Sequence, residues 1–222
     1  MVANFSATQN YTVTSNHVHL LVKAGHDLDT IPKSMQLIAG QTAQQYNRRK
    51  SRKGAFWEDR YHATAVQDGE HLARCLVYID MNMVRAGVVR HPSDWKDGGY
   101  REIFEPSSGK KIISIGSLLR ELHLDRPDDL RVTYSKWITE IMAAERQTRD
   151  ERWTESLAVG EQSYIDRVSK DLEEDGRTLR RSAVYDSDGV TDLREPVAHY
   201  GIEFDFTPEN MSFEGELCEI TS

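Results

Sequence analysis

Two histidines near the N-terminus have a spacing that suits metal binding. His17 and His19 flank Val18 in the stretch YTVTSNHVHLLV, residues 11–22. The β-branched and apolar residues of this stretch predict a strand from Tyr11 to Val22. Because side chains alternate across a strand, both imidazoles would project from one face and could bind one metal ion. Such pairs also occur as surface or structural residues, so the pair alone leaves both interpretations open.

A tyrosine and an asparagine have the types and spacing for phosphodiester chemistry. Tyr78 and Asn82 lie in EHLARCLVYIDMNMV, residues 70–84, whose apolar residues recur near the helical period. Four residues apart, they would share one face of the helix. A phenol with a pKa of about 10 needs a cation that neutralises and aligns the phosphate oxygens before it can attack. Taken alone, Tyr78 could equally be a half-buried aromatic residue of the helix.

The ligand types limit the choice of metal. Two histidine nitrogens and one amide oxygen suit Mg²⁺ or Mn²⁺ and leave positions for a DNA phosphate. Mg²⁺ prefers oxygen ligands, so the two nitrogens favour Mn²⁺ in affinity, and abundance favours Mg²⁺.

A basic stretch with interleaved aromatic residues lies between these two motifs. It follows a predicted amphipathic helix from about Ile31 to Tyr46 and precedes a predicted strand from about Arg60 to Val66. Such a surface can neutralise phosphates and stack unpaired bases. The candidate DNA-binding residues are Arg48, Arg49, Lys50, Arg52, Lys53, Trp57 and Arg60. The alternative is a solvated charged loop with Phe56 and Trp57 in the core. Arg85, about two turns after Tyr78, either contacts DNA or caps the end of its helix.

Charge divides the chain into two unlike parts. The net charge of −8 is the sum of about +4 over residues 1–111 (15 Lys and Arg against 11 Asp and Glu) and about −12 over residues 112–222 (13 against 25). We therefore expect a catalytic domain over residues 1–106 and an acidic, mainly helical extension over residues 107–222. The extension begins with the linker-like SSGKK, residues 107–111, and contains predicted helices at about Ile115–Leu122 and Pro127–Arg146. A polyanion responds to local charge, so the acidic total does not exclude DNA as a ligand.

Composition also bounds where the protein acts. Cys75 and Cys218 match no zinc or redox spacing, which favours incidental thiols in a reducing compartment. The chain has no run of about 20 apolar residues, and its N-terminus is unlike a signal peptide. We therefore expect a cytoplasmic protein that is neither exported nor bound to a membrane.

Three of these motifs together resemble a known family. SNHVHLLV, GAFWEDRYHATAV and YIDMNMVRAGVV are similar in order, spacing and context to the single-tyrosine HUH transposases, which include small insertion-sequence transposases and REP-associated tyrosine transposases. The resemblance covers roughly residues 11–104. It implies that His17, His19 and Asn82 are metal ligands and that Tyr78 is the nucleophile.

The resemblance also implies a fold and a reaction. The fold is α+β, with a ferredoxin-like antiparallel sheet and helices on one face. Tyr78 would attack a phosphate of single-stranded or hairpin DNA, keep the 5′ end as a phosphotyrosine and release a 3′-hydroxyl that later reverses the step. A homodimer is among the assemblies that the family allows.

The chain departs from the family at its N-terminus. Members usually carry a strand and a helix before the histidine strand, whereas only about ten residues precede it here. A sheet shortened in this way would expose an edge. An inactive, truncated transposase that only binds structured DNA is therefore the alternative to an active enzyme. A replication or conjugation nickase is less favoured, because its usual companion domains are absent.

Overall fold

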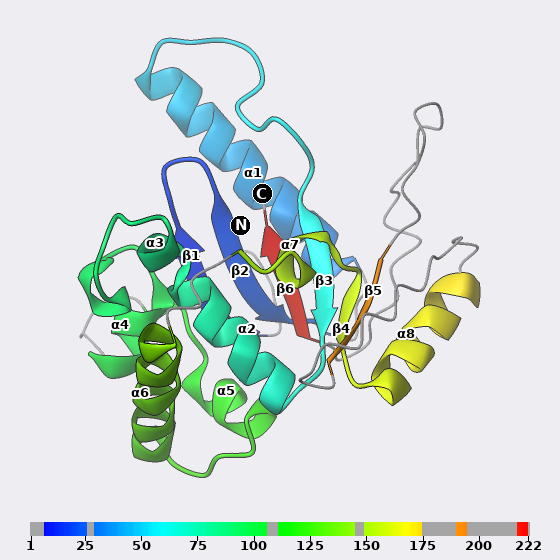
Figure 1. Cartoon of the computed structure of the whole chain (residues 1–222). Coiled ribbons are helices and arrows are strands. Elements are labelled where there is room, and N and C mark those ends of the chain that lie inside the picture. The colour runs from blue at the N-terminus through cyan, green and yellow to red at the C-terminus, as the bar shows by residue number, and fades with distance from the viewer. Residues whose placement is uncertain are drawn as a thin grey trace.

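The computed structural model describes residues 7–25, 29–105, 111–144, 149–174 and 190–194, together with the backbone of residues 217–221. Figure 1 shows the strands and helices, and the two parts of the chain that differ in charge both contribute strands to one sheet. The order is β1 (Ala7–Val13), β2 (Val18–Lys23), α1 (Thr30–Arg49), β3 (His62–Val66), α2 (Glu70–Asp80), α3 (Asn82–Arg85), η1 (Pro92–Asp94), α4 (Gly99–Phe104), α5 (Ile115–Glu121), α6 (Pro127–Ala143), α7 (Arg152–Glu155), β4 (Ala158–Gly160), α8 (Gln162–Glu174), β5 (Thr191–Leu193) and β6 (Leu217–Thr221).

The sheet has the strand order β1-β2-β6-β3-β4-β5, and all of its pairings are antiparallel except β3 with β4. This confirms the expected α+β class with an antiparallel sheet. The single strand predicted from Tyr11 to Val22 is wrong in one respect. The stretch forms a hairpin, because the chain turns at Thr14–His17 and Val13 pairs with Val18. The polar residues Ser15 and Asn16 favour such a turn.

A strand from the far C-terminal end completes the centre of this sheet. β6 pairs with β2 on one side, where His19 is opposite Thr221, and with β3 on the other, where Thr64 is opposite Glu219. β2 is therefore paired along both of its edges, with β1 on one side and with β6 on the other. Each backbone N–H and C=O paired in this way no longer needs water.

Helices pack against both faces of the sheet (Figure 1). On one face, α2, α5 and α6 form the main core with Leu21 of β2 and Val66 of β3. On the opposite face, α1 contributes Met35 to a cluster with Val22. α8 packs through Ile165 and Val168 beside Ala65 of β3 in a further cluster. Alternation along β2 and β3 explains the split, since neighbouring residues face opposite layers.

The predicted helices in both parts of the chain are confirmed, with small changes at their ends. The helix predicted for residues 70–84 is divided, because α2 ends at Asp80 and α3 begins at Asn82. The acidic extension contributes α5 and α6 as expected and adds β4, β5 and β6 to the sheet. The proposed linker falls almost entirely outside the described residues. Among the helices that the structure describes, none is long and apolar enough to cross a membrane.

Candidate active site

Three of the residues singled out in the sequence converge on the α2 side of the sheet. His19, in β2, lies beside Tyr78 of α2 with the two ring centroids 6.1 Å apart and the rings nearly perpendicular. Asn82, at the start of α3, lies with its amide nitrogen 3.0 Å from the Nε2 atom of His19. His19 and Tyr78 are 4% and 7% exposed. The break after α2 therefore keeps Tyr78 and Asn82 beside the same imidazole, as the four-residue spacing predicted.

The contact between His19 and Asn82 has a geometry that fits a shared metal ion. Turning the Asn82 amide over exchanges its nitrogen and oxygen, which places an oxygen acceptor near the imidazole nitrogen. Two ligands on adjacent corners of an octahedron, each about 2.1 Å from the ion, lie about 3.0 Å apart. The observed separation of 3.0 Å is that of a hydrogen bond and also equals this spacing. These two residues thus suit the divalent ion expected from the sequence.

His17 lies in a different setting from the one expected. It is exposed and ends the hairpin turn rather than lying within the strand. Its backbone N–H donates to the Thr14 hydroxyl at 2.9 Å, and its carbonyl accepts from the Thr14 N–H at 2.8 Å. These bonds fix the backbone of the turn two residues before His19. The assignment of His17 as a metal ligand stays a prediction.

Arg85 contacts the tyrosine directly. Its guanidinium lies 4.1 Å from the centre of the Tyr78 ring, and its Nη2 donates to the Tyr78 carbonyl at 2.8 Å. The last carbonyls of a helix lack intrahelical donors, so this bond satisfies one near the end of α2. Of the two roles that the sequence left open, this contact is that of a helix cap, and it adds a cation over the phenol ring.

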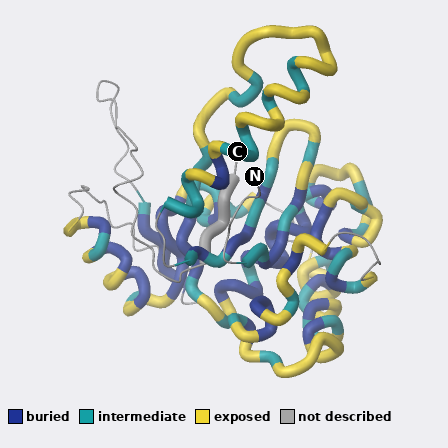
Figure 2. The backbone as a smooth tube through the Cα atoms, turned by 180° about the vertical axis from the view of Figure 1, so that it is seen from behind, coloured by how far each residue is buried: buried dark blue, intermediate teal, exposed yellow. Residues whose placement is uncertain are grey.

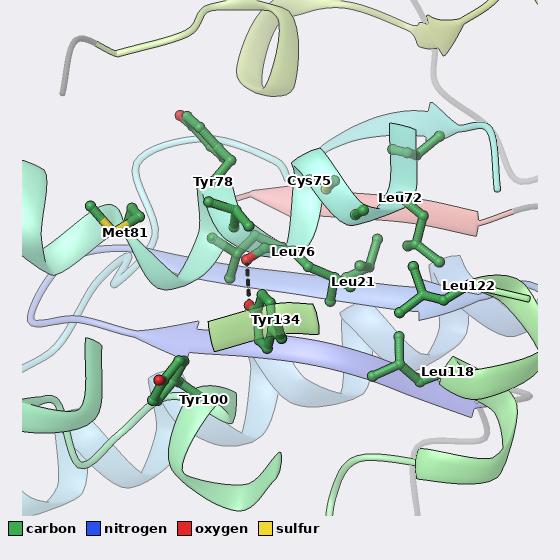
Figure 3. Packing of buried hydrophobic residues seen from close by; sticks show 14 of the residues in the cluster. Leu21, Leu72, Cys75, Leu76, Tyr78, Met81, Tyr100, Leu118, Leu122 and Tyr134 are labelled. Atoms are coloured by element: carbon green, nitrogen blue, oxygen red, sulfur yellow. Dashed lines mark hydrogen bonds between the residues drawn. The ribbon is translucent and has the colours of Figure 1, made fainter. Parts of the chain in front are cut away.

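Asn10 and Tyr134 form a buried polar cluster with the C-terminal end of α2. Asp80, 4% exposed, accepts from Asn10 Nδ2 at 3.2 Å and from the Tyr134 hydroxyl. The same hydroxyl lies 3.0 Å from the Leu76 carbonyl (Figure 3). Burial raises the pKa of the Asp80 carboxyl to about 7, and the hydrogen bonds from Tyr134 and Asn10 oppose this rise. The pKa of Tyr134 is raised well above its ordinary value, first by burial and then by Asp80.

The acidic extension also reaches the tyrosine. Trp153 of α7 is 4% exposed and lies with its ring 6.0 Å from that of Tyr78, at an angle of 35°. In Figure 3 the Tyr78 ring extends away from Leu76 and Tyr134, toward the other side of α2. Sequence reasoning missed Trp153, because nothing in the charged stretch around it predicts which helix it would contact. Asp80 was missed as well, although a lone carboxylate in an apolar helical run is a signal that could have found it.

The basic residues occupy a projecting part of the molecule. Figure 1 shows α1 extending past the end of the sheet that carries the β1–β2 turn. Arg48 and Arg49 lie in the last turn of α1, and the exposed loop that follows (Figure 2) carries Lys50, Arg52, Lys53 and Arg60. All six basic side chains are exposed. Trp57 is half-buried and donates from its indole nitrogen to the Ala39 carbonyl at 3.0 Å.

The aromatic residues of this loop pack on one another. Phe56 lies between Tyr46 and Trp57, at 4.6 and 4.8 Å between ring centroids. Arg52 lies over the Tyr46 ring at 5.8 Å. Phe56 and Trp57 are half-buried and pack in this small aromatic cluster beside exposed cations. The DNA-binding role of the stretch stays a prediction.

Comparison with known proteins gives one match. Residues 4–82 match the family model described as "Transposase IS200 like". No curated protein and no solved structure shows a significant match to the chain. The matched segment contains β1, β2, α1, β3 and α2 and ends at Asn82, so it includes His17, His19, Tyr78 and Asn82.

Proposed function

We propose, from the match of residues 4–82 to the family model "Transposase IS200 like", that the protein cleaves and rejoins single-stranded DNA through a phosphotyrosine at Tyr78. The family itself indicates a transposase, an enzyme that acts on DNA in transposition. The observation that carries the finer proposal is the convergence of Tyr78, His19 and Asn82.

The reaction follows from the chemistry of the phenol. The Tyr78 oxygen attacks a backbone phosphorus and loses its proton to solvent, the bond from phosphorus to the 3′ oxygen breaks, and that oxygen leaves as a 3′-hydroxyl after taking up a proton. The 5′ end stays on Tyr78 as a phosphodiester. Because one phosphodiester replaces another, a 3′-hydroxyl can later attack the phosphotyrosine and rejoin DNA without ATP.

His19 and Asn82 are the residues that would hold a divalent ion, with His17 as the third ligand proposed from the sequence. Mg²⁺ or Mn²⁺ bound there would neutralise and align the phosphate oxygens. The chain contributes rigidity to this site. His19 is fixed in a paired strand, and Asn82 is fixed at the start of α3.

Tyr78 and the proposed ligands His19 and Asn82 lie beside one another in a single chain. Tyr78 and His19 are neighbours in the monomer, so the reaction does not require a tyrosine from a second copy. We infer that a dimer, if one forms, is not needed to assemble the nucleophile and the ligands. The exposed loop after α1 supplies the cations for binding single-stranded or hairpin DNA in the cytoplasm.

The test is a denaturing-gel assay with labelled single-stranded hairpin oligonucleotides taken from the DNA that flanks the gene. Purified protein is incubated with Mn²⁺ and with 5′- or 3′-labelled strands. We expect a covalent adduct that retains the 5′ end of the downstream fragment, and Tyr78→Phe should abolish it. Tyr164→Phe is the matched control, because it removes another buried phenol, one on α8 and on the other face of the sheet.

Two outcomes would contradict the proposal. An adduct that persists in Tyr78→Phe would assign the nucleophile to another residue. Hairpin binding without any adduct, across all flanking oligonucleotides, would identify the protein as an inactive transposase that only binds DNA. His19→Ala separates the two functions further, since it should remove cleavage and leave hairpin affinity within about twofold of wild type.

A further inference from the structure

Tyr78 is held by residues that come from outside the matched segment. The match ends at Asn82, whereas Arg85 and Trp153 follow it in the chain. Arg85 lies over the Tyr78 ring at 4.1 Å, and Trp153 lies 6.0 Å from it. With His19 edge-on at 6.1 Å, three side chains from three different elements surround one phenol.

We propose that Trp153, brought against α2 by the acidic extension, is a positioning residue that holds the Tyr78 ring in the orientation from which its oxygen attacks DNA. This inference rests on the proposed function, because it assigns Trp153 a part in the same reaction. A phenol on a helix has two free side-chain torsions, and a packed neighbour removes the alternatives. Preorganisation of this kind lowers the activation barrier without adding contacts to the substrate.

The anchoring of α7 supports a fixed neighbour. The residue after α7, Ser156, accepts at its carbonyl from the Thr64 hydroxyl at 2.6 Å and lies 3.0 Å from His62 Nε2, both in β3. Its own hydroxyl donates to Asp192 of β5 at 2.7 Å. Arg194 donates to the same carboxylate at 2.8 Å.

Two backbone hydrogen bonds join Leu157, which follows Ser156, to the sheet. The Ala65 N–H donates to the Leu157 carbonyl at 2.8 Å, and the Leu157 N–H donates to the Leu193 carbonyl at 2.6 Å. Arg194 also pairs with Glu151 and Glu155 at the two ends of α7, at 3.8 and 3.5 Å. The residues that directly follow the short helix are thus bonded to β3 and β5, and Arg194 pairs with both ends of the helix. Trp153 has little freedom to leave, which favours a positioning role over that of a removable cover.

The experiment compares Trp153→Ala with a matched control, Trp137→Ala. Trp137 is a half-buried tryptophan at the edge of the same core, and its ring contact is with Tyr134. Single-turnover adduct formation is measured at saturating hairpin DNA, and the Kd for DNA is measured separately. We expect Trp153→Ala to lower the rate constant on the order of 10-fold to 100-fold, with Kd within about twofold. Trp153→Phe should recover most of the rate, because it keeps a ring in place.

Several results would overturn the inference. They are a rate for Trp153→Ala equal to that of Trp137→Ala, a rate above that of wild type, or a loss confined to Kd. A thermal melt identifies a variant that does not fold. If Trp153→Ala is unfolded, Trp153→Leu, which keeps apolar bulk without the ring, replaces it with the same expectation.

A second readout needs no DNA chemistry. With 3-fluorotyrosine incorporated at position 78 alone, Trp153→Ala should shift the fluorine resonance, and Trp137→Ala should not. An unchanged resonance would overturn the inference even if the enzyme is active. If wild type forms no adduct while the resonance shifts, the proposed function fails, and the positioning role fails with it, although the contact is confirmed.

Discussion

Asp80 should make the stability of the protein fall as the pH rises. Its pKa is about 7 in the folded protein, against an ordinary value of 3.8. The folded state therefore binds a proton that the unfolded chain has released, and the stabilisation is present at low pH and lost as the pH rises through about 7. From pH 5 to pH 8.5 the wild type should lose about 2.7 kcal/mol of unfolding free energy through this group alone.

Asp80→Asn is the perturbation that removes this loss. The amide can accept from Asn10 through its oxygen and donate to the Tyr134 oxygen through its nitrogen. Tyr134 can then direct its own proton to the Leu76 carbonyl, which lies 3.0 Å away. The variant should thus keep its hydrogen bonds and carry no charge. Its unfolding free energy should fall less with pH than that of wild type, by about 2.7 kcal/mol over the same range.

The assay is urea unfolding at pH 5 and pH 8.5 with a chelator present, so that no metal ion influences the carboxyl. Asp125→Asn, which neutralises an exposed carboxylate between α5 and α6, is the control and should follow the wild type. Parallel pH dependence of wild type and Asp80→Asn would contradict this prediction. It would mean that Asp80 keeps an ordinary pKa despite its burial.

Three further predictions follow from the packing, the sheet register and the exposed cations. Gly99→Ala should destabilise the protein by roughly 1–3 kcal/mol, because the added Cβ would lie 2.0 Å from Asn10 Oδ1. Gly40→Ala is the control and should be neutral or stabilising, because nothing lies within 4 Å of a Cβ at this position in α1. Urea unfolding measures the free energy of both variants. Ala65→Cys should form a disulfide with Cys218, which is opposite residue 65 in β6, whereas Ala63→Cys, opposite Ile220, should not. Mass spectrometry with and without reductant detects the disulfide. Equal crosslinking in the two variants would contradict the register of β3 and β6. Replacing Arg48, Arg49 and Lys50 with glutamine should reduce the slope of log Kd for single-stranded DNA against log salt by about 2, and an unchanged slope would remove these residues from the DNA interface.

Residue patterns predicted most of the helices and a candidate chemistry for the site. α1, α2, α5 and α6 were predicted because each helix buries one side, and burial of one side places apolar residues three or four positions apart in the sequence. The four-residue spacing of Tyr78 and Asn82 survives the break at Met81, because Met81 itself keeps a right-handed helical backbone with φ −75° and ψ −4°. Residue types alone indicated a nucleophile and ligands for a divalent ion.

Sequence reasoning placed His17 and His19 in one strand, and only the fold assigned them to a turn and a strand. Thr14 and His17 hydrogen-bond to each other and close a hairpin within what reads as one β-rich run. A turn of polar residues competes with strand extension, and the pairing of β1 with β2 decides the outcome.

The tertiary structure alone decided which distant segments complete the site. β6 lies between β2 and β3 and pairs with them through backbone hydrogen bonds. Because every residue type offers the same backbone groups, the sequence of a strand scarcely indicates which strand it pairs with. Trp153 contacts Tyr78 because Ser156 and Leu157, which follow α7, are hydrogen-bonded to β3 and β5. All of these contacts join residues that are far apart in the sequence. Short-range periodicity records which face of an element is buried, but what lies against that face depends on how the whole chain packs.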